Sequence, residues 1–414
     1  MVKLNVIYLV KGLCLIVLAF PHYAMAQYKG SASVTQGVAK TTASNLYTCS
    51  GGRTTNMGSI KAQDSSQWTV PAINNFSNGQ FPWSSDLHNV CTGKTYANAN
   101  AAIAVLDGTD VITIDSAGEL ITAYIFADNY FELYINGVPV GKDKVPYTQF
   151  NSSVVRFKVK RPFIIAFQLI DWEEHLGLGS ELNGGFAYHP GDGGLVAVFK
   201  DAKNNTVAKT GSDWKAQTFY TSPIKDLACP TENGTQRLTA NCNTADATDG
   251  SLYYGLHWSK PTTWMNSDFD DADWPNASVY SNAAVGVNNK PAYTNFTAIF
   301  DDAQADAEFI WSTNLILDNE VVVRYKVNKL SSQLQNQYLE PRFKIHPNPS
   351  QGNFEIQLPS LAFQHLSIIN TLGQTVFETK VDVEKISLNQ LTTGIYFVKI
   401  ISNECTLVKK IVVQ

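Results

Sequence analysis

Charge is scarce in this chain. Lys and Arg number 31 and Asp and Glu 36 among 414 residues, so that charged residues make up 16% and the formal net charge is −5. Binding to phosphate backbones needs a basic field, and this balance excludes nucleic acid as a partner. No segment approaches the roughly 18–20 consecutive apolar residues of a membrane-spanning helix, so a transmembrane segment is excluded as well.

The motifs of several enzyme and metal-protein classes are also missing. The chain has no Gly-x-Ser-x-Gly elbow, no P-loop and no dinucleotide fingerprint, and none of its cysteine spacings is a Cys-x-x-Cys zinc pattern. Apolar residues at helical spacing are absent too. Asn, Thr, Ser and Gly are abundant and aromatic residues reach 11%. This composition is typical of an extracellular β protein.

The N-terminus has the pattern of a secretory signal peptide. A short apolar run at 13–20 follows two lysines, and Ala24 and Ala26 are small residues at −3 and −1 before Gln27. This pattern predicts cleavage after Ala26, with residues 1–26 removed on export. The alternative is a membrane anchor, for which the apolar run is too short.

The cysteines fit an oxidising compartment. Cys229 and Cys242 bracket a polar loop and form the first candidate disulfide, and Cys49 and Cys91 form the second. Closing loops of these sizes stabilises a fold by roughly 2–4 kcal/mol each. Cys405 is left without a predicted partner.

Strand patterns dominate the middle of the chain. Apolar residues alternate with polar ones at 131–135, 155–159 and 321–327, whereas 163–170 and 195–199 are continuous apolar runs of the kind found in strands buried on both faces. Asn136-Gly137 predicts a type I′ hairpin turn onto 138–140, because both residues tolerate positive φ. A long strand is expected at 307–317.

Many short antiparallel strands with Gly, Asn and Asp turns predict an all-β antiparallel sandwich or jelly roll, followed by a small C-terminal β-sandwich. The predicted divisions are the signal peptide at 1–26, an N-terminal extension at 27–100, the main sandwich at 101–327, a polar linker at 328–343 and a C-terminal domain at 344–414. The extension is expected to have isolated strands at most. It would pack on the sandwich through Trp68, Trp83 and a Cys49–Cys91 bridge, and an independent small domain is the alternative.

The segment 344–414 carries an ordered set of short motifs: a Pro-Asn-Pro phrase, a central Leu-Gly and a Gly-x-Tyr-x-Val phrase. It resembles the C-terminal sorting domain of the Bacteroidetes type IX secretion system. The resemblance implies a secreted or cell-surface protein, the secretion machinery as a partner, and removal of the domain to leave a body of roughly 27–343. The residues that carry the match are Pro347, Asn348, Pro349, Gly352, Gly373, Gly394 and Tyr396.

Two phrases in the body are similar to galactose-binding-like jelly rolls. They are Asp268-Phe-Asp-Asp-Ala-Asp-Trp-Pro-Asn-Ala277 and Ala127-Asp-Asn-Tyr-Phe-Glu-Leu-Tyr-Ile-Asn-Gly137, which occur here in the reverse of the family's order. The resemblance implies a sandwich fold and a carbohydrate ligand. Fold alone does not give function.

The richest polar cluster lies at 171–194, between two predicted buried strands. Such a long connection would lie at the rim of the sandwich, and binding sites are commonly built on loops of this kind. An aromatic face for a sugar ring and carboxylates and imidazoles for its hydroxyls would make a glycan site. In the alternative reading the tryptophan caps the core and the acids are solvated. The candidate ligand-binding residues are Trp172, Glu173, Glu174, His175, His189 and Asp192, joined by Trp83 and His257 from other clusters.

The same carboxylates suggest a rival function. Glycosidases need pairs of acids about 5–10 Å apart, and Asp171, Glu173, Glu174 and Asp192 offer such pairs. A zinc site from His175 and His189 matches no ligand spacing. Structural calcium is the other ion considered, in oxygen-rich turns. The candidate calcium ligands are Asp107, Asp110, Asp270, Asp271 and Asp273.

The function predicted from these observations is noncatalytic carbohydrate binding or adhesion at the cell surface. The alternatives are an enzyme that acts on polysaccharide, with carboxylates at 171–192, and a purely structural surface component.

Overall fold

The computed structural model describes residues 28–49, 53–106, 110–146, 150–183, 186–244, 253–303, 305–328, 342–358, 364–380, 385–389, 391–402 and 406–414. The predicted signal peptide, Asp107, Cys405 and most of the predicted linker lie outside these ranges. Within them the chain is almost entirely β, as predicted. The helices are α1 (Ala99–Ile103), α2 (Pro291–Thr294) and α3 (Thr297–Phe300).

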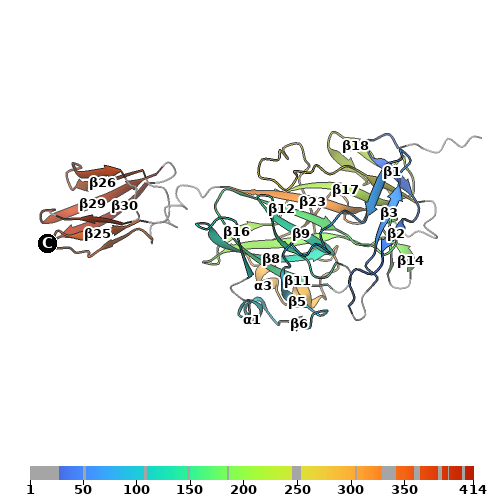
Figure 1. The fold of residues 1–414 in the computed structure, drawn as a ribbon, viewed down its shortest axis with the longest axis horizontal. Coiled ribbons are helices and arrows are strands. Elements are labelled where there is room, and N and C mark those ends of the chain that lie inside the picture. The colour runs from blue at the N-terminus through green and yellow to red at the C-terminus, as the bar shows by residue number, and fades with distance from the viewer. Residues whose placement is uncertain are drawn as a thin grey trace, which may run out of the picture.

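Two large sheets, antiparallel apart from one parallel pair between β7 and β11, form the body (Figure 1). In the first, seven strands lie in the order β1 (Ser33–Gln36), β20 (Tyr254–His257), β17 (Lys215–Ile224), β23 (Asp318–Val327), β12 (Phe163–Ile170), β9 (Tyr130–Ile135) and β10 (Val138–Lys142). In the second, nine strands are β21 (Ser278–Tyr280), β22 (Phe309–Trp311), β15 (Gly194–Asp201), β8 (Glu119–Asp128), β11 (Ser152–Val159), β5 (Ser85–Asn89) and β6 (Lys94–Thr95), with β16 (Thr206–Lys209) beside β15 and β7 (Val111–Thr113) beside β11.

The central strands are buried on both faces, as their unbroken apolar runs predict. In β12, Ile165, Phe167 and Leu169 enter the core between the two sheets, together with residues of β8 and β15. The alternate residues Ile164 and Ala166 face a second apolar cluster, which includes Trp258, Trp264 and Trp274 from the loops after β20. Side chains alternate across a strand, so a sheet covered on both faces needs apolar residues at every position.

Local turn chemistry explains why one predicted hairpin is confirmed and why one predicted strand was too long. Asn136 and Gly137 have φ of +50° and +81°, the positive values that the type I′ turn between β9 and β10 requires. The long strand expected at 307–317 ends at Trp311. There the Asn314 side-chain oxygen accepts hydrogen bonds from the backbone N–H groups of Ile316 and Leu317, at 3.0 and 3.1 Å, and turns the chain.

The residues before 101 contribute strands to both large sheets and are not limited to isolated strands. β1 pairs with β20, and β5 pairs with β11. Between them, β2 (Lys40–Ala43), β3 (Met57–Lys61) and β4 (Gln67–Val70) form a separate three-stranded sheet. The division of the body at residue 101 stays a prediction, although hydrogen-bonded sheets run across it.

Both predicted disulfides are present. Cys49 and Cys91 are joined with a Cα–Cα distance of 5.2 Å, and Cys229 and Cys242 with one of 5.1 Å. The second bridge lies beside the hairpin of β18 (Thr231–Asn233) and β19 (Gln236–Leu238). A further hairpin of β13 (Glu181–Asn183) and β14 (Phe186–His189) lies within the long 171–194 connection.

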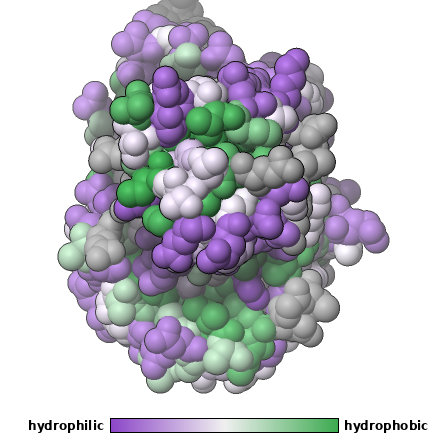
Figure 2. Space-filling view, turned by 90° about the vertical axis from the view of Figure 1, so that its left-hand side faces the viewer, coloured by the Kyte–Doolittle hydropathy of each residue, from purple (hydrophilic) through white to green (hydrophobic). Residues whose placement is uncertain are grey.

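The C-terminal residues form a small sandwich with a core of its own, built from Phe343 onward. One sheet contains β24 (Lys344–His346), β25 (Phe354–Gln357) and β28 (Lys385–Leu388), and the other β27 (Thr375–Lys380), β26 (His365–Asn370), β29 (Gly394–Ile401) and β30 (Thr406–Val413). Figure 2, viewed from the side of this sandwich, shows hydrophobic side chains scattered among hydrophilic ones. Its exposed hydrophobic residues include Leu372, Val376, Ile395, Phe397 and Val408.

Several motif residues of this segment have identifiable structural roles. The Asn348 side chain donates to Lys410 O at 2.8 Å and accepts from Val412 N at 2.9 Å, so it fastens the Pro-Asn-Pro phrase to β30. Gly373 has φ of +81° in the turn after β26, a conformation that favours glycine. The Tyr396 hydroxyl donates to Thr392 O at 2.9 Å and fixes the start of β29.

Candidate functional site

Four acidic side chains gather at one end of the body because of how its strands begin and end. β8 ends at Asp128, and β12 ends directly before Asp171. Asp192 precedes the start of β15, whose Gly194 lies opposite Asp128 in the sheet. Glu173 follows β12 in the 171–194 connection. We call Asp128, Asp171, Glu173 and Asp192 the acidic cluster.

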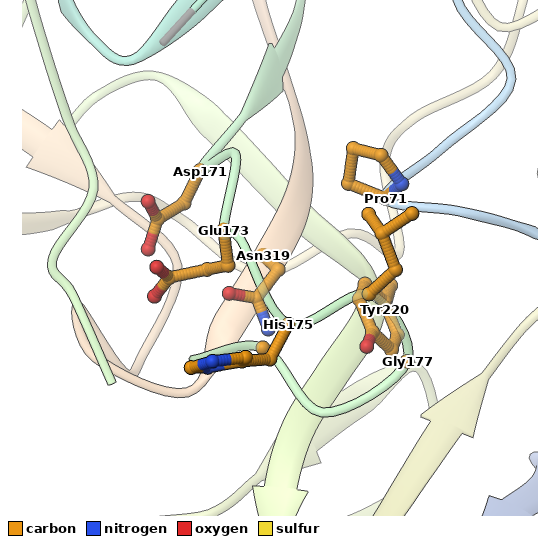
Figure 3. Close-up of a pocket in the computed structure, with 9 residues that line it drawn as sticks. Pro71, Asp171, Glu173, His175, Gly177, Tyr220 and Asn319 are labelled. Atoms are coloured by element: carbon orange, nitrogen blue, oxygen red, sulfur yellow. The ribbon is translucent and has the colours of Figure 1, made fainter. Parts of the chain in front are cut away.

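A small pocket opens beside two of these acids (Figure 3). Asp171, Glu173, His175, Tyr220 and Asn319 are among the residues that line it. The space in it that the centre of a water-sized sphere can occupy is about 10 Å³, roughly what a single water molecule needs. The pocket therefore suits an ion or a single water better than a sugar chain.

Burial and mutual repulsion make the acidic cluster electrostatically unusual. Loss of hydration raises the pKa of Asp128 and of Asp171 well above the ordinary range, and neighbouring carboxylates raise it further. Burial is also the largest cause for Glu173, whose pKa rises to about 8, and for Asp192, whose pKa rises to about 6. Perturbed acids in a pocket mark a candidate functional site.

The predicted ligand residues of the 171–194 connection do not all face this pocket. Glu173 and His175 line it. Glu174 instead accepts a hydrogen bond from Leu182 N at 3.0 Å. His175 packs on Tyr188 with ring centroids 4.4 Å apart, and His189 lies in β14 opposite Glu181. The two imidazoles thus have different neighbours.

Two predicted ligand residues are part of the core. Trp172 is 0% exposed, and its indole N–H donates to Asn56 O at 2.9 Å. His257 is buried between Trp68 and Tyr220, at ring-centroid distances of 5.1 and 4.4 Å, and this burial lowers its pKa to about 3. Neither ring offers a face to a sugar, which corrects the expectation that they would and favours the reading in which Trp172 caps the core.

Trp83 differs from these rings because 45% of it is exposed. It packs edge-to-face with Phe76, with ring centroids 5.3 Å apart, and Phe76 in turn packs on Trp172. The Lys142 ammonium lies 3.9 Å from the Trp83 ring centroid. This ammonium donates to the backbone oxygens of Asn75, Phe76 and Asn78 at 2.7, 2.7 and 2.8 Å.

The backbone around Trp83 is fixed as well. Lys142 N donates to Pro82 O at 3.0 Å, and Ser84 N donates to Lys142 O at 2.9 Å. Trp83 is therefore an exposed indole on a rigid support. Trp83 and His257 are not among the residues that line the pocket beside Asp171 and Glu173.

The predicted calcium ligands are not brought together. In the part of the chain that the structure describes, no group of three or more His, Cys, Asp or Glu side chains could hold a metal ion. Asp271 forms an ion pair with the buried Arg324, at 2.6 Å. Asp270 caps its own turn by accepting from Ala272 N, and Asp110 accepts from Ser85. Asp107 lies outside the described residues, and its role stays a prediction.

Three residues at or near the pocket were not predicted from local sequence patterns. Asp128, Tyr220 and Asn319 come from β8, β17 and β23. Asp128-Asn129 and Asp318-Asn319 have the composition of turns at strand ends, which does not mark either pair as part of a site. Only the pairing of distant strands places them beside Asp171.

Comparison with known proteins identifies the C-terminal segment. Residues 344–414 match the family model of the secretion system C-terminal sorting domain. The chain thus carries a type IX sorting domain, interacts with that secretion machinery and is a secreted or cell-surface protein. No curated protein matches the chain. Among the described residues, no helix has the length and apolar character needed to span a membrane.

Similarity to solved structures is weak. PorZ, a surface component of the type IX secretion system of Porphyromonas gingivalis, is 14% identical over 23% of this chain and 14% of its own, with a TM-score of 0.18. A β-glucuronidase of Faecalibacterium prausnitzii is 10% identical over 93% of this chain and 47% of its own, with a TM-score of 0.16. The chain thus spans less than half of either protein. Scores this low carry no argument about fold or function.

Proposed function

We propose that the body of this secreted or cell-surface protein binds carbohydrate without catalysis, and that Trp83 is its stacking residue. The observation that carries the proposal is the exposed and rigidly supported indole of Trp83. Indole faces stack on the CH-rich faces of sugar rings, and a ring held in place loses little conformational entropy on binding.

The surroundings of Trp83 support a polar ligand. Ser77, Asn78 and Gln80 are exposed in the loop that wraps the Lys142 ammonium. Their hydroxyl and amide groups can exchange hydrogen bonds with sugar hydroxyls. Low overall charge and export to the cell surface fit the same role.

The rival enzymatic function receives less support from the geometry. Asp171 and Glu173 share a pocket, but its volume of about 10 Å³ leaves no room for a sugar chain between them. The Glu174 carboxylate does not line this pocket and accepts a hydrogen bond from Leu182 N instead. The acids are therefore assigned no catalytic role.

A glycan array with the body, residues 27–343, tests the proposal. We expect retention of at least one glycan class at millimolar concentration or better. Trp83→Ala should weaken that binding about tenfold or more, equivalent to about 1.4 kcal/mol, and Trp83→Phe should retain part of it. Val279→Ala, at an exposed apolar position of the body, serves as the control and should bind as the wild type does.

Two results would count against the proposal. A wild-type body that retains no glycan would favour the purely structural role at the cell surface. Glycan binding that is unchanged in Trp83→Ala would remove Trp83 from the site. Release of reducing sugars from polysaccharide would instead support the enzyme.

A further inference from the structure

Three buried oxygen atoms beside the pocket have no hydrogen-bond partner. They are Asp171 Oδ2, Glu173 Oε2 and Asn319 Oδ1, from residues that are 2%, 3% and 0% exposed. All three residues line the pocket, and Figure 3 shows the two carboxylates and the Asn319 amide oxygen on the same side. Buried acceptors without partners are costly, since each has lost its hydration.

The orientation of these oxygens is set by their partner atoms. Asn319 Nδ2 donates to Ser222 O at 2.8 Å and to Leu317 O at 3.3 Å, which leaves the amide oxygen as the free end. Glu173 Oε1 accepts from Gly191 N at 2.6 Å, so Oε2 is the remaining oxygen. Asp171 N donates to Asn319 O at 2.9 Å and holds the two residues together.

The basic side chains that act on the acidic cluster are engaged elsewhere. Arg53 forms an ion pair with Glu181, and the Lys290 ammonium lies 4.6 Å from the Phe150 ring centroid. Each of these two cations thus has a partner outside the cluster. A buried pair of carboxylates needs a proton or a cation as a partner.

We propose that this pocket binds a calcium ion, with Asp171, Glu173 and Asn319 as protein ligands. Oxygen donors without nitrogen or sulfur suit a hard cation, and Ca²⁺ accepts carboxylates, amide carbonyls and waters in flexible sets of six to eight. The described residues contain no group of three or more His, Cys, Asp or Glu that could hold a metal ion. The site proposed here is of another kind, because it has two carboxylates and one amide. The pocket is separate from Trp83 and from the Asp270 turn where calcium was first expected.

Thermal unfolding of the full secreted chain, stripped with EDTA and then titrated with CaCl₂, tests the assignment. The expected result is a saturable rise of the unfolding midpoint with a stoichiometry of one ion per chain by calorimetry. Asp171→Asn and Glu173→Gln should lose this rise. Asp270→Asn is the matched control, since it changes an acid of the alternative turn, and it should keep the rise.

A second measurement keeps the test decisive if the variants do not fold. Tb³⁺ bound to the wild type should luminesce on excitation of nearby aromatic rings such as Tyr220, and Ca²⁺ should displace it. Three results would each overturn the proposal: no response of the wild type to Ca²⁺, a response that survives in Asp171→Asn and Glu173→Gln, or a stronger response to K⁺ or Zn²⁺ than to Ca²⁺. Loss of calcium binding with glycan binding intact would leave the proposed function untouched.

Discussion

Replacement of Lys142 by methionine should destabilise the body by about 3–5 kcal/mol. The ammonium is fully buried and donates to three backbone oxygens, those of Asn75, Phe76 and Asn78. Hydrogen bonds to a charged group contribute roughly 1.5–3 kcal/mol each. The sum overstates the loss, because methionine also avoids the cost of burying a charge and because the 75–78 loop can turn its carbonyls to water.

Urea unfolding followed by tryptophan fluorescence measures this loss. Lys144→Met is a matched control two residues away. Lys144 is 27% exposed and pairs at 3.3 Å with the buried Asp86, which keeps its hydrogen bonds from Asn89 and Thr92 in the variant. Loss of this one charged contact should cost only about 1–2 kcal/mol. Lys142→Met should also weaken glycan binding, because the support under Trp83 is lost. Equal and small losses in the two variants would refute the role assigned to the ammonium.

Two further predictions concern a buried acid and the sorting domain. Burial raises the pKa of Asp143 from 3.8 to about 7, so this group favours the folded state below about pH 4 and loses that contribution as pH rises to about 7. Asp143→Asn can keep the hydrogen bonds from Val145 N and Asn151. This variant should be more stable than the wild type at pH 8 by up to about 4 kcal/mol, with no gain at pH 4. Chemical unfolding at both pH values checks this, and an equal stability difference at the two pH values would contradict it. Deletion of 344–414 should leave the protein in the periplasm, as immunoblots of cell fractions and medium can show, and its appearance in the medium would contradict the assigned role of the domain.

Much of the fold was predictable because it rests on local patterns. The alternation at 321–327 and the unbroken run at 163–170 correspond to β23 and β12. The hairpin at Asn136-Gly137 follows from the φ angles that these two residues accept. The strand at 307–317 was wrong because one side chain, that of Asn314, bonds to the backbone and turns it. Such a competition between side chain and strand is not visible in an apolar pattern.

The candidate site was predictable only in part. The 171–194 connection was identified from its polar residues between buried strands, and it does supply Glu173 and His175 to the pocket. Whether Trp172 faces solvent or core depends on Phe76 and Tyr130, which come from distant segments. The exposure of Trp83 likewise depends on Lys142 and Phe76, which cover part of the indole ring and leave the rest exposed to solvent.

The sequence by itself determined the class of the fold, the two disulfide pairs and the address carried by 344–414. Each of these is encoded in residues near one another in the chain or in a motif of fixed order. The tertiary structure alone decided which acids meet and which aromatic ring is exposed. Asp171 and Asn319 lie 148 positions apart in the chain, yet backbone pairing between β12 and β23 places them side by side. Strand pairing over such separations follows from the packing of the whole core, so it cannot be predicted from a local sequence pattern.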